Sequence, residues 1–222
     1  MSGPSQIALP LAAAVPAGTR RIVVGNANAA VIEALEAPER WPFGVAVLTG
    51  LPRAGKTLLG QWAQRLHGVE RLDVIDDVER LEETHLFHRW NAVQEGGTQA
   101  TTQGGRALLL IANADPSGGA SWRITLPDLA SRIGGSLQLE VGVPDDQMAG
   151  ELILAHAEQR GLSLPEGAAD YLAPRTTRSF AAIEALVAAI DRISLERQTP
   201  ATMSVWRAAL EALHGPEQQR LL

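Results

Sequence analysis

One stretch of this sequence combines residue types and spacing that suit phosphate binding. Residues 50–57 read Gly-Leu-Pro-Arg-Ala-Gly-Lys-Thr and match G-x-x-x-x-G-K-[ST] at every fixed position. Glycines let the backbone turn tightly and bring its N–H groups against phosphate oxygens. We therefore predict nucleotide contacts from Gly50, Leu51, Pro52, Arg53, Ala54, Gly55, Lys56, Thr57 and Leu58. Lys56 would bridge the β- and γ-phosphates, and the Thr57 hydroxyl would hold Mg²⁺.

The segments on either side of this loop have the patterns that such a loop needs. Residues 44–49 are apolar and predict a short buried strand, and residues 58–67 have helical spacing. The helix would present its unpaired N–H groups to the anion. Lys56 is also the single lysine, since the other members of the 19 Lys plus Arg are arginines. The alternative is a chance match in a glycine-rich chain.

A pair of aspartates follows the next apolar segment. Residues 71–75 lead into Asp76 and Asp77 at the end of a predicted strand. In a nucleotide site Asp76 would hold Mg²⁺ through water, and Asp77 would orient a water towards the γ-phosphate. An acidic turn that caps the next helix is the alternative.

A third candidate position follows residues 106–112, a continuous apolar run typical of a central strand in a sheet covered on both faces. Asn113 ends this run, where its side chain could contact the γ-phosphate or the attacking water. An asparagine that caps a turn would give the same pattern. Both interpretations of Asn113 stay open at this point.

Composition limits the class of protein. The 222 residues carry a formal net charge of −6, which does not favour binding nucleic acid through bulk electrostatics. There is no cysteine, so disulfides and thiolate metal sites are excluded. The N-terminus lacks the pattern of a signal peptide, and no apolar run approaches the ~20 residues of a membrane helix. We expect a cytoplasmic protein without a membrane partner.

The chain divides into three parts by composition. Residues 1–19 are rich in Pro, Gly, Ser and Ala and predict a flexible leader that carries the apolar segment Gln6–Leu11. Residues 20–143 alternate strand and helix patterns. Residues 144–222 are helical, with helices expected at about 144–160, 166–172, 178–197 and 202–213. Thr176 or Thr177 is the expected cap of the third of these helices.

These features occur in the order found in a known family. The ordered set is Gln6–Leu11, Ile22–Asn26, the loop at 50–57, Val74–Asp77, the segment LPDLASR at 126–132, and Arg178. On these residues the chain resembles the DnaA-related AAA+ proteins, and among them the Hda family, which inactivates the replication initiator DnaA. The resemblance extends over nearly the whole chain. It implies an AAA+ P-loop NTPase core, an α/β fold with a parallel sheet, followed by a helical lid.

The resemblance also implies roles for single residues. Arg132 would be an arginine finger that acts in trans on the nucleotide of a neighbouring subunit, and Arg178 would be a second nucleotide sensor in the lid. Asn113 would be the first sensor. Val24 and Gly25 would contact the nucleotide, which would be ADP or ATP with Mg²⁺. A surface salt bridge is the alternative for Arg132, and an exposed helix-start arginine is the alternative for Arg178.

The leader has its own implied partner. In the Hda family a peptide of the QxxLxL type docks on the DNA polymerase sliding clamp, the beta subunit. The matching residues here are Gln6, Ile7, Leu9 and Leu11. Such a peptide would bind through apolar anchors in a preformed pocket and hydrogen bonds from the glutamine.

Two departures from the family pattern are informative. No helix-turn-helix segment follows the lid helices, so direct sequence-specific DNA binding is not expected. Only 20 residues separate Lys56 from Asp76, which leaves no room for the strand and helix usually found there. We therefore predict four parallel strands, with the edge strand of the order 5-1-4-3-2 missing.

The sequence supports three functions. The first is a negative regulator of replication initiation that docks on the clamp and stimulates hydrolysis of DnaA-bound ATP through Arg132. The second is a self-contained P-loop NTPase or a small-molecule kinase. The third is a DnaA-like protein in initiator assembly at an origin. Whether the chain turns over nucleotide itself, and whether it forms a homo-oligomer, stays open.

Overall fold

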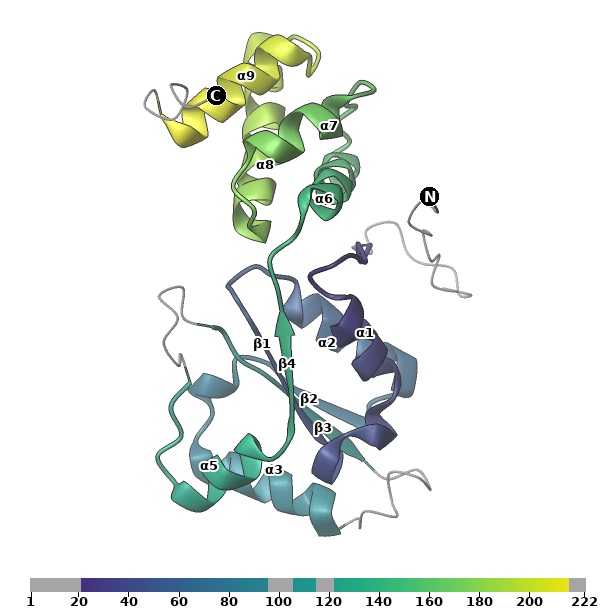
Figure 1. The fold of residues 1–222 in the computed structure, drawn as a ribbon, viewed down its shortest axis with the longest axis vertical. Helices are drawn as coiled ribbons and strands as arrows, with labels where there is room; N and C mark the ends of the chain where they lie inside the picture. Colours follow the sequence, from purple (N-terminus) through teal and green to yellow (C-terminus); the bar gives the residue numbers. More distant parts are fainter. Residues whose placement is uncertain (1–20, 96–105, 115–121, 216–222) are drawn as a thin grey trace. The chain divides into compact units, whose positions relative to one another are not determined.

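The computed structural model describes residues 21–95, 106–114 and 122–215 (Figure 1). The chain forms two compact units, one of residues 28–142 and one in which residues 21–27 join the C-terminal part from residue 143 onward.

The first unit is built on a four-stranded parallel sheet. Its strands are β1 (Val45–Gly50), β2 (Leu72–Ile75), β3 (Ala107–Ile111) and β4 (Leu137–Val141). They lie in the order β2-β3-β1-β4. In the family order 5-1-4-3-2, the strands β4, β1, β3 and β2 take the positions 5, 1, 4 and 3, and position 2 is absent. This is the expected four-stranded core. The prediction of a reduced parallel sheet is confirmed.

Burial explains which strands are central. All five residues of β3 are buried, as are five of the six residues of β1. The outer strands β2 and β4 alternate or expose part of their side chains. Continuous apolar runs therefore occupy the positions that are covered on both faces, as parallel sheets require.

Helices cover both faces of this sheet (Figure 1). The helices α1 (Ala29–Glu36) and α2 (Lys56–His67) lie on one face, and α3 (Glu83–Glu95) and α5 (Pro127–Gly134) lie on the other. On the α3 side Val45, Val47, Leu108 and Leu110 pack with Leu86, Trp90, Leu129 and Ile133. Short 3-10 turns complete the unit at Pro38–Arg40, Pro42–Gly44 and Val78–Arg80.

The outer edge of β2 has no strand beside it among the described residues. The carbonyl of Arg71 faces β3, since it accepts from Ala107 N at 2.7 Å. Because the main-chain N–H and C=O groups of successive residues point to alternate sides of a strand, those of Leu72 and Val74 point away from β3. The carbonyl of Leu72 accepts from Gln64 Nε2 at 3.3 Å. Among the described residues, no main-chain partner therefore faces the edge at Val74.

The second unit is helical. It contains α6 (Asp146–Gln159), α7 (Ala168–Leu172), a 3-10 turn at Ala173–Arg175, α8 (Phe180–Arg197) and α9 (Met203–His214). A continuous core joins these helices, with Ile153, Leu172, Ile183, Leu186 and Ile190 fully buried. Each helix of the second unit lies within a few residues of its sequence prediction.

The caps of this unit include one correction. Ser179 caps α8, since its side chain accepts a hydrogen bond from Ala182 N at 3.1 Å. The prediction of Thr176 or Thr177 as the cap is wrong, because the helix begins two residues later than expected. Asp145 caps α6 by accepting from Met148 N at 2.8 Å, as its position before the first helical turn favours.

Candidate functional site

The loop between β1 and α2 has the conformation that its glycines permit. Gly55 lies in the left-handed region with φ 79°, directly before the first residue of α2. A Cβ built on Gly55 would meet no atom within 4 Å, so the backbone requires glycine while the space above it is open. Residues 50–55 thus turn the chain from the carboxyl end of β1 into the N-terminus of a helix, the arrangement that suits an anion.

Lys56 reaches back over this loop. Its Nζ donates to the carbonyls of Gly50 and Leu51, both at 2.8 Å, and to Asn113 Oδ1 at 3.0 Å. The residue is 6% exposed. Burial lowers the pKa of the Lys56 amine, and the negative charges of Asp76, Glu79 and Asp77 partly oppose that shift. Lys56 therefore carries its charge at a cost that a bound anion would offset.

Asn113 joins the lysine to the acidic segment after β2. Its Nδ2 donates to Glu79 Oε1 at 2.7 Å and lies 3.4 Å from Asp77 Oδ1. Its backbone N–H also donates to Glu79 Oε1, at 3.4 Å. Asn113 is thus a bridge between Lys56 and Glu79, and the interpretation as a simple turn cap does not describe its contacts.

Glu79 is the residue of this site that the sequence analysis missed. It lies in the 3-10 turn Val78–Arg80 and is half-buried, and its Oε2 is shielded from solvent and has no hydrogen-bond partner in the part of the chain that the structure describes. The signal was present as a third acid in the run Asp76-Asp77-Val78-Glu79. A pattern that ends at the paired aspartates overlooks it.

The two aspartates have different surroundings. Asp76 is exposed, and its Oδ1 accepts from the backbone N–H of Asp77 at 2.9 Å. Asp77 adopts a left-handed φ of 49° and forms a solvent-exposed ion pair with Arg80 at 3.3 Å. An aspartate held in this conformation marks a local constraint at the end of β2. Thr57 is exposed at the first turn of α2.

These residues converge because of the strand order. The loop follows β1, Asp76 follows β2 and Asn113 follows β3, so all three lie at the carboxyl edge of a parallel sheet. The connection after β1 leads to β2 on one side of the sheet, and the connection after the neighbouring strand β3 leads to β4 on the other side. Ligands bind in α/β sheets at the point where the direction of the connections changes in this way. The open space at Gly55, the buried amine of Lys56 and the unpartnered Glu79 oxygen suit a phosphate with a hard cation. Thr57 and Asp76 would hold the Mg²⁺.

Arg132 lies at the other end of the sheet. It belongs to the last turn of α5, and β4 starts five residues later with Leu137 beside Ala46, near the start of β1. Its Nε donates to Asp128 Oδ2 at 2.9 Å and its Nη1 donates to Asn91 Oδ1 at 3.3 Å. The side chain is 36% exposed. Arg132 is therefore neither buried in its own fold nor near its own phosphate loop.

The predicted nucleotide contacts at Val24 and Gly25 belong to the helical unit. A Cβ on Gly25 would come within 2.7 Å of the Met148 side chain, so glycine allows the backbone to lie against α6. Asn26 joins this segment to the start of α6, donating to Val143 O and accepting from Asp145 N, each at 3.0 Å. The structure thus gives Gly25 and Asn26 a packing role in this unit.

Arg178 lies one residue before the Ser179 cap of α8. It forms an ion pair with Asp146, with Nη2 3.0 Å from Oδ1, and both side chains are about half exposed. Gln6, Ile7, Leu9 and Leu11 lie outside the described residues. Among the described residues, no helix is both long and apolar enough to cross a membrane, and no group of three His, Cys, Asp or Glu side chains could hold a metal ion.

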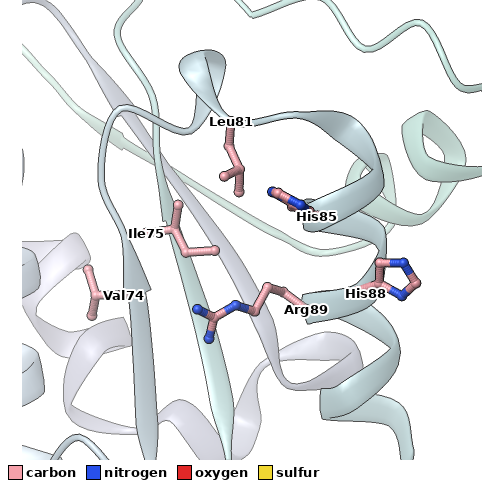
Figure 2. Close-up of a pocket in the computed structure, with 6 residues that line it drawn as sticks. All are labelled: Val74, Ile75, Leu81, His85, His88 and Arg89. Atoms are coloured by element: carbon pink, nitrogen blue, oxygen red, sulfur yellow. The ribbon is translucent and has the colours of Figure 1, made fainter.

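A groove runs between the open edge of β2 and α3 (Figure 2). Apolar and basic side chains line it together: Val74, Ile75, Leu81, His85, His88 and Arg89. Arg89 pairs with Asp73 at 2.7 Å, and Arg106 pairs with the same carboxylate at 3.3 Å. These ion pairs join β2 to α3 and to the residue before β3.

Comparison with known proteins identifies the fold and the helical unit. The Hda lid domain family matches residues 146–210. The chain is similar to domain III of the Thermotoga maritima replication initiation protein DnaA, with 16% identity, a TM-score of 0.62, and coverage of 88% of this chain and 95% of that one. It is also similar to the Thermotoga maritima RuvB Holliday junction branch migration motor, with 19% identity, a TM-score of 0.59, and coverage of 86% and 70%. At these identities the structural likeness establishes the fold.

Proposed function

We propose that this chain is an Hda-like, DnaA-related AAA+ protein and that it is a negative regulator of replication initiation; the match of its helical unit to the Hda lid domain and its DnaA-like fold support this. In this proposal it binds ADP or ATP with Mg²⁺, docks on the DNA sliding clamp through its leader, and stimulates hydrolysis of the ATP held by DnaA. The chemistry takes place on DnaA, and turnover by this chain itself is weak or absent.

The position of Arg132 carries the proposal. The residue lies at the end of the sheet opposite its own phosphate loop, and its guanidinium is partly open to solvent. An arginine in that place cannot serve the nucleotide of its own subunit, but it can enter the site of a neighbour. The family resemblance supplies the identity of that neighbour, DnaA.

The proposed chemistry is phosphoryl transfer to water. Water attacks the γ-phosphorus, and the bond to the β–γ bridging oxygen breaks, which gives ADP and inorganic phosphate. Negative charge spreads over the γ-phosphoryl oxygens in the transition state, and a guanidinium placed there stabilises it. Arg132 would supply that charge to DnaA in trans.

The nucleotide of this chain would have a structural role in the proposal. Residues 50–58 bind its phosphates, Asn113 contacts the terminal phosphate as the first sensor, and Asp77 orients water there. By the family resemblance, Val24, Gly25 and Arg178 would also contact the nucleotide. These roles rest on the resemblance and on the cluster that Lys56, Asn113 and Glu79 form.

The experiment is a DnaA-bound ATP hydrolysis assay with and without this protein and DNA-loaded clamp. We expect stimulation that needs both additions. Replacing Gln6, Leu9 and Leu11 together by alanine should remove the clamp dependence, and Lys56→Ala should remove nucleotide binding. Lack of stimulation by the intact protein under any of these conditions contradicts the regulatory function.

A self-contained NTPase is the second candidate. The cluster of Lys56, Asp76, Asp77, Glu79 and Asn113 favours it, because these groups could bind phosphates, metal and water within one subunit. Steady turnover of ATP by the purified protein alone, lost in Asp77→Asn, would support this candidate. We place the protein in the cytoplasm, and its assembly state would follow from the same preparations.

A further inference from the structure

One face of α3 carries three side chains that contact α5 or the residues just before it. Glu83, Phe87 and Asn91 are spaced four residues apart, so they follow one another along the same face of the helix. We call these three residues the α3 stripe. Figure 1 shows α3 and α5 on the same side of the sheet, within the first unit.

Glu83 fixes the start of α5. Its carboxylate accepts from Thr125 N at 2.7 Å, from Thr125 Oγ1 at 2.9 Å and from Leu126 N at 2.8 Å. The pKa of Glu83 is lowered mainly by the hydrogen bond from Thr125 N; desolvation opposes this shift, and the bonds from Leu126 N and Thr125 Oγ1 add to it. Because Leu126 is the N-cap of α5, the carboxylate holds the first turn of that helix against α3.

Phe87 and Asn91 hold the other end of α5, at Arg132. The guanidinium carbon of Arg132 lies 5.1 Å from the centre of the Phe87 ring, a cation–π distance. Asn91 Oδ1 accepts from Nη1 at 3.3 Å, and Asp128 Oδ2 accepts from Nε at 2.9 Å from within α5. Three groups thus fix the plane and the direction of one guanidinium.

We propose that the α3 stripe, with Asp128, consists of positioning residues that present Arg132 to the nucleotide of a neighbouring subunit. This inference rests on the proposed function of Arg132. A guanidinium has five N–H donors, and the contacts above engage only Nε and Nη1. Nη2 makes no hydrogen bond to the described residues, so the anchored side chain offers that end to an anion.

The physical reason is pre-organisation. An arginine side chain has many rotamers, and an unanchored one must lose that freedom when it enters a partner's site. Stacking on Phe87 and bonds to Asn91 and Asp128 remove that freedom beforehand. A misplacement of about 1 Å at such a group costs roughly 10²-fold in rate. The stripe should therefore act on the rate of hydrolysis rather than on assembly with DnaA.

The test uses the full-length chain in the clamp-dependent DnaA assay, titrated to saturation. Asn91→Ala and Phe87→Leu should each lower the maximal stimulated rate about 10-fold or more, within the range set by misplacement. The concentration that gives half-maximal stimulation should stay unchanged. Phe87→Tyr keeps the ring face and should restore the rate. His88→Ala, on the groove side of the same helix, is the matched control and should behave as the wild type.

The outcomes separate this inference from the proposed function. If Arg132→Ala stimulates fully, both fail. If Arg132→Ala is inactive while Asn91→Ala and Phe87→Leu keep the wild-type maximal rate, only the positioning role fails. It also fails if these variants only raise the half-maximal concentration, which would indicate a role in assembly. The Arg132 Nε–H signal in NMR adds a readout without DnaA. Its exchange with water should accelerate in Asp128→Ala, which removes the acceptor of Nε–H, and unchanged exchange contradicts the anchoring.

Discussion

Lys56 Nζ donates a 3.0 Å hydrogen bond to Asn113 Oδ1, and this contact joins the first residue of α2 to the segment that follows β3. Through Asn113 the lysine is coupled to Glu79, at the end of β2. The segments that follow three strands therefore meet through three side chains and two hydrogen bonds. A phosphate that binds Lys56 competes with an acceptor that belongs to this network, so binding should change the contacts of Asn113 as well.

The first prediction concerns the pKa of Lys56. Burial lowers this pKa below the model-compound value of 10.5. A bound nucleotide places negative charge beside the amine, which favours its protonated form and should raise the pKa. Because Lys56 is the single lysine, labelling with ¹³C-lysine gives one side-chain ammonium signal to titrate by NMR. A pKa that falls or stays constant when ADP and Mg²⁺ are added would contradict the phosphate contact.

The same shift predicts how stability depends on pH. The unfolded chain binds the lysine proton more tightly than the folded protein does. At a pH where Lys56 is charged in both states, burial of the charged amine therefore lowers the free energy of unfolding. The free energy of unfolding should therefore rise as pH increases from the lowered pKa towards 10.5. Urea denaturation at several alkaline pH values measures this dependence of the free energy of unfolding on pH. In Lys56→Met the rise that Lys56 causes should be absent.

The second prediction concerns Glu79 and Asn113. Removing either partner leaves a half-buried polar group without its hydrogen bond, which costs about 1 to 3 kcal/mol of unfolding free energy. Because the two side chains are in direct contact, Glu79→Ala and Asn113→Ala should be non-additive by about 0.5 to 3 kcal/mol. Urea denaturation of the two single variants and the double variant measures the coupling. Glu82→Ala, an exposed neighbour, is the control, and additive effects would disprove the contact.

The four-stranded sheet could be predicted from the sequence because the chain length between the motifs limits how many elements fit. Lys56 and Asp76 are 20 positions apart, and this length holds one helix and one strand but no more, so the absence of a further strand followed from chain length. The continuous apolar run before Asn113 likewise predicted a central strand, which is β3. Strands and helices can be predicted where the local apolar pattern and the available chain length allow a single arrangement of elements.

Contacts between distant segments could not be predicted in this way. Glu79 bonds to Asn113, 34 residues away, and Arg132 bonds to Asn91, 41 residues away. Neither pairing has a local pattern, because both depend on how strands and helices pack. The segment with Gly25 joins the helical unit for the same reason, through Asn26 and Val143, which are 117 residues apart.

The third prediction tests the open edge of the sheet. The Val74 N–H points away from β3, whereas Asp73 and Ile75 direct their N–H groups towards it. We expect the Val74 amide to exchange with solvent at least about 100-fold faster than those of its two neighbours, as an amide without a strand partner should. Hydrogen exchange followed by NMR measures the three residues side by side. Equal protection at all three would mean that another segment pairs with this edge.

The fourth prediction separates two roles of Arg178. Its ion pair with Asp146 is about half exposed on both sides, so losing it should cost less than about 1 kcal/mol of stability. Arg178→Ala should nevertheless weaken ADP binding if the residue is a nucleotide sensor. Asp146→Asn breaks the same ion pair but keeps the arginine, and it is the matched control. Calorimetric titration with ADP compares the wild type and the two variants. Equal ADP affinities in all three proteins would mean that Arg178 only forms the ion pair and does not contact the nucleotide.

The most direct test of the regulatory function is the rate of DnaA-bound ATP hydrolysis with Arg132→Ala in place of the wild-type chain, in the presence of DNA-loaded clamp. Arg65→Ala is the matched control, because Arg65 is also in the last turn of a helix of the first unit and is exposed. We predict that Arg132→Ala reduces the rate to that of DnaA without this protein, since an arginine finger contributes about 10³- to 10⁵-fold, and that Arg65→Ala stimulates normally. Full stimulation by folded Arg132→Ala would contradict the proposal that this arginine acts on the nucleotide of DnaA.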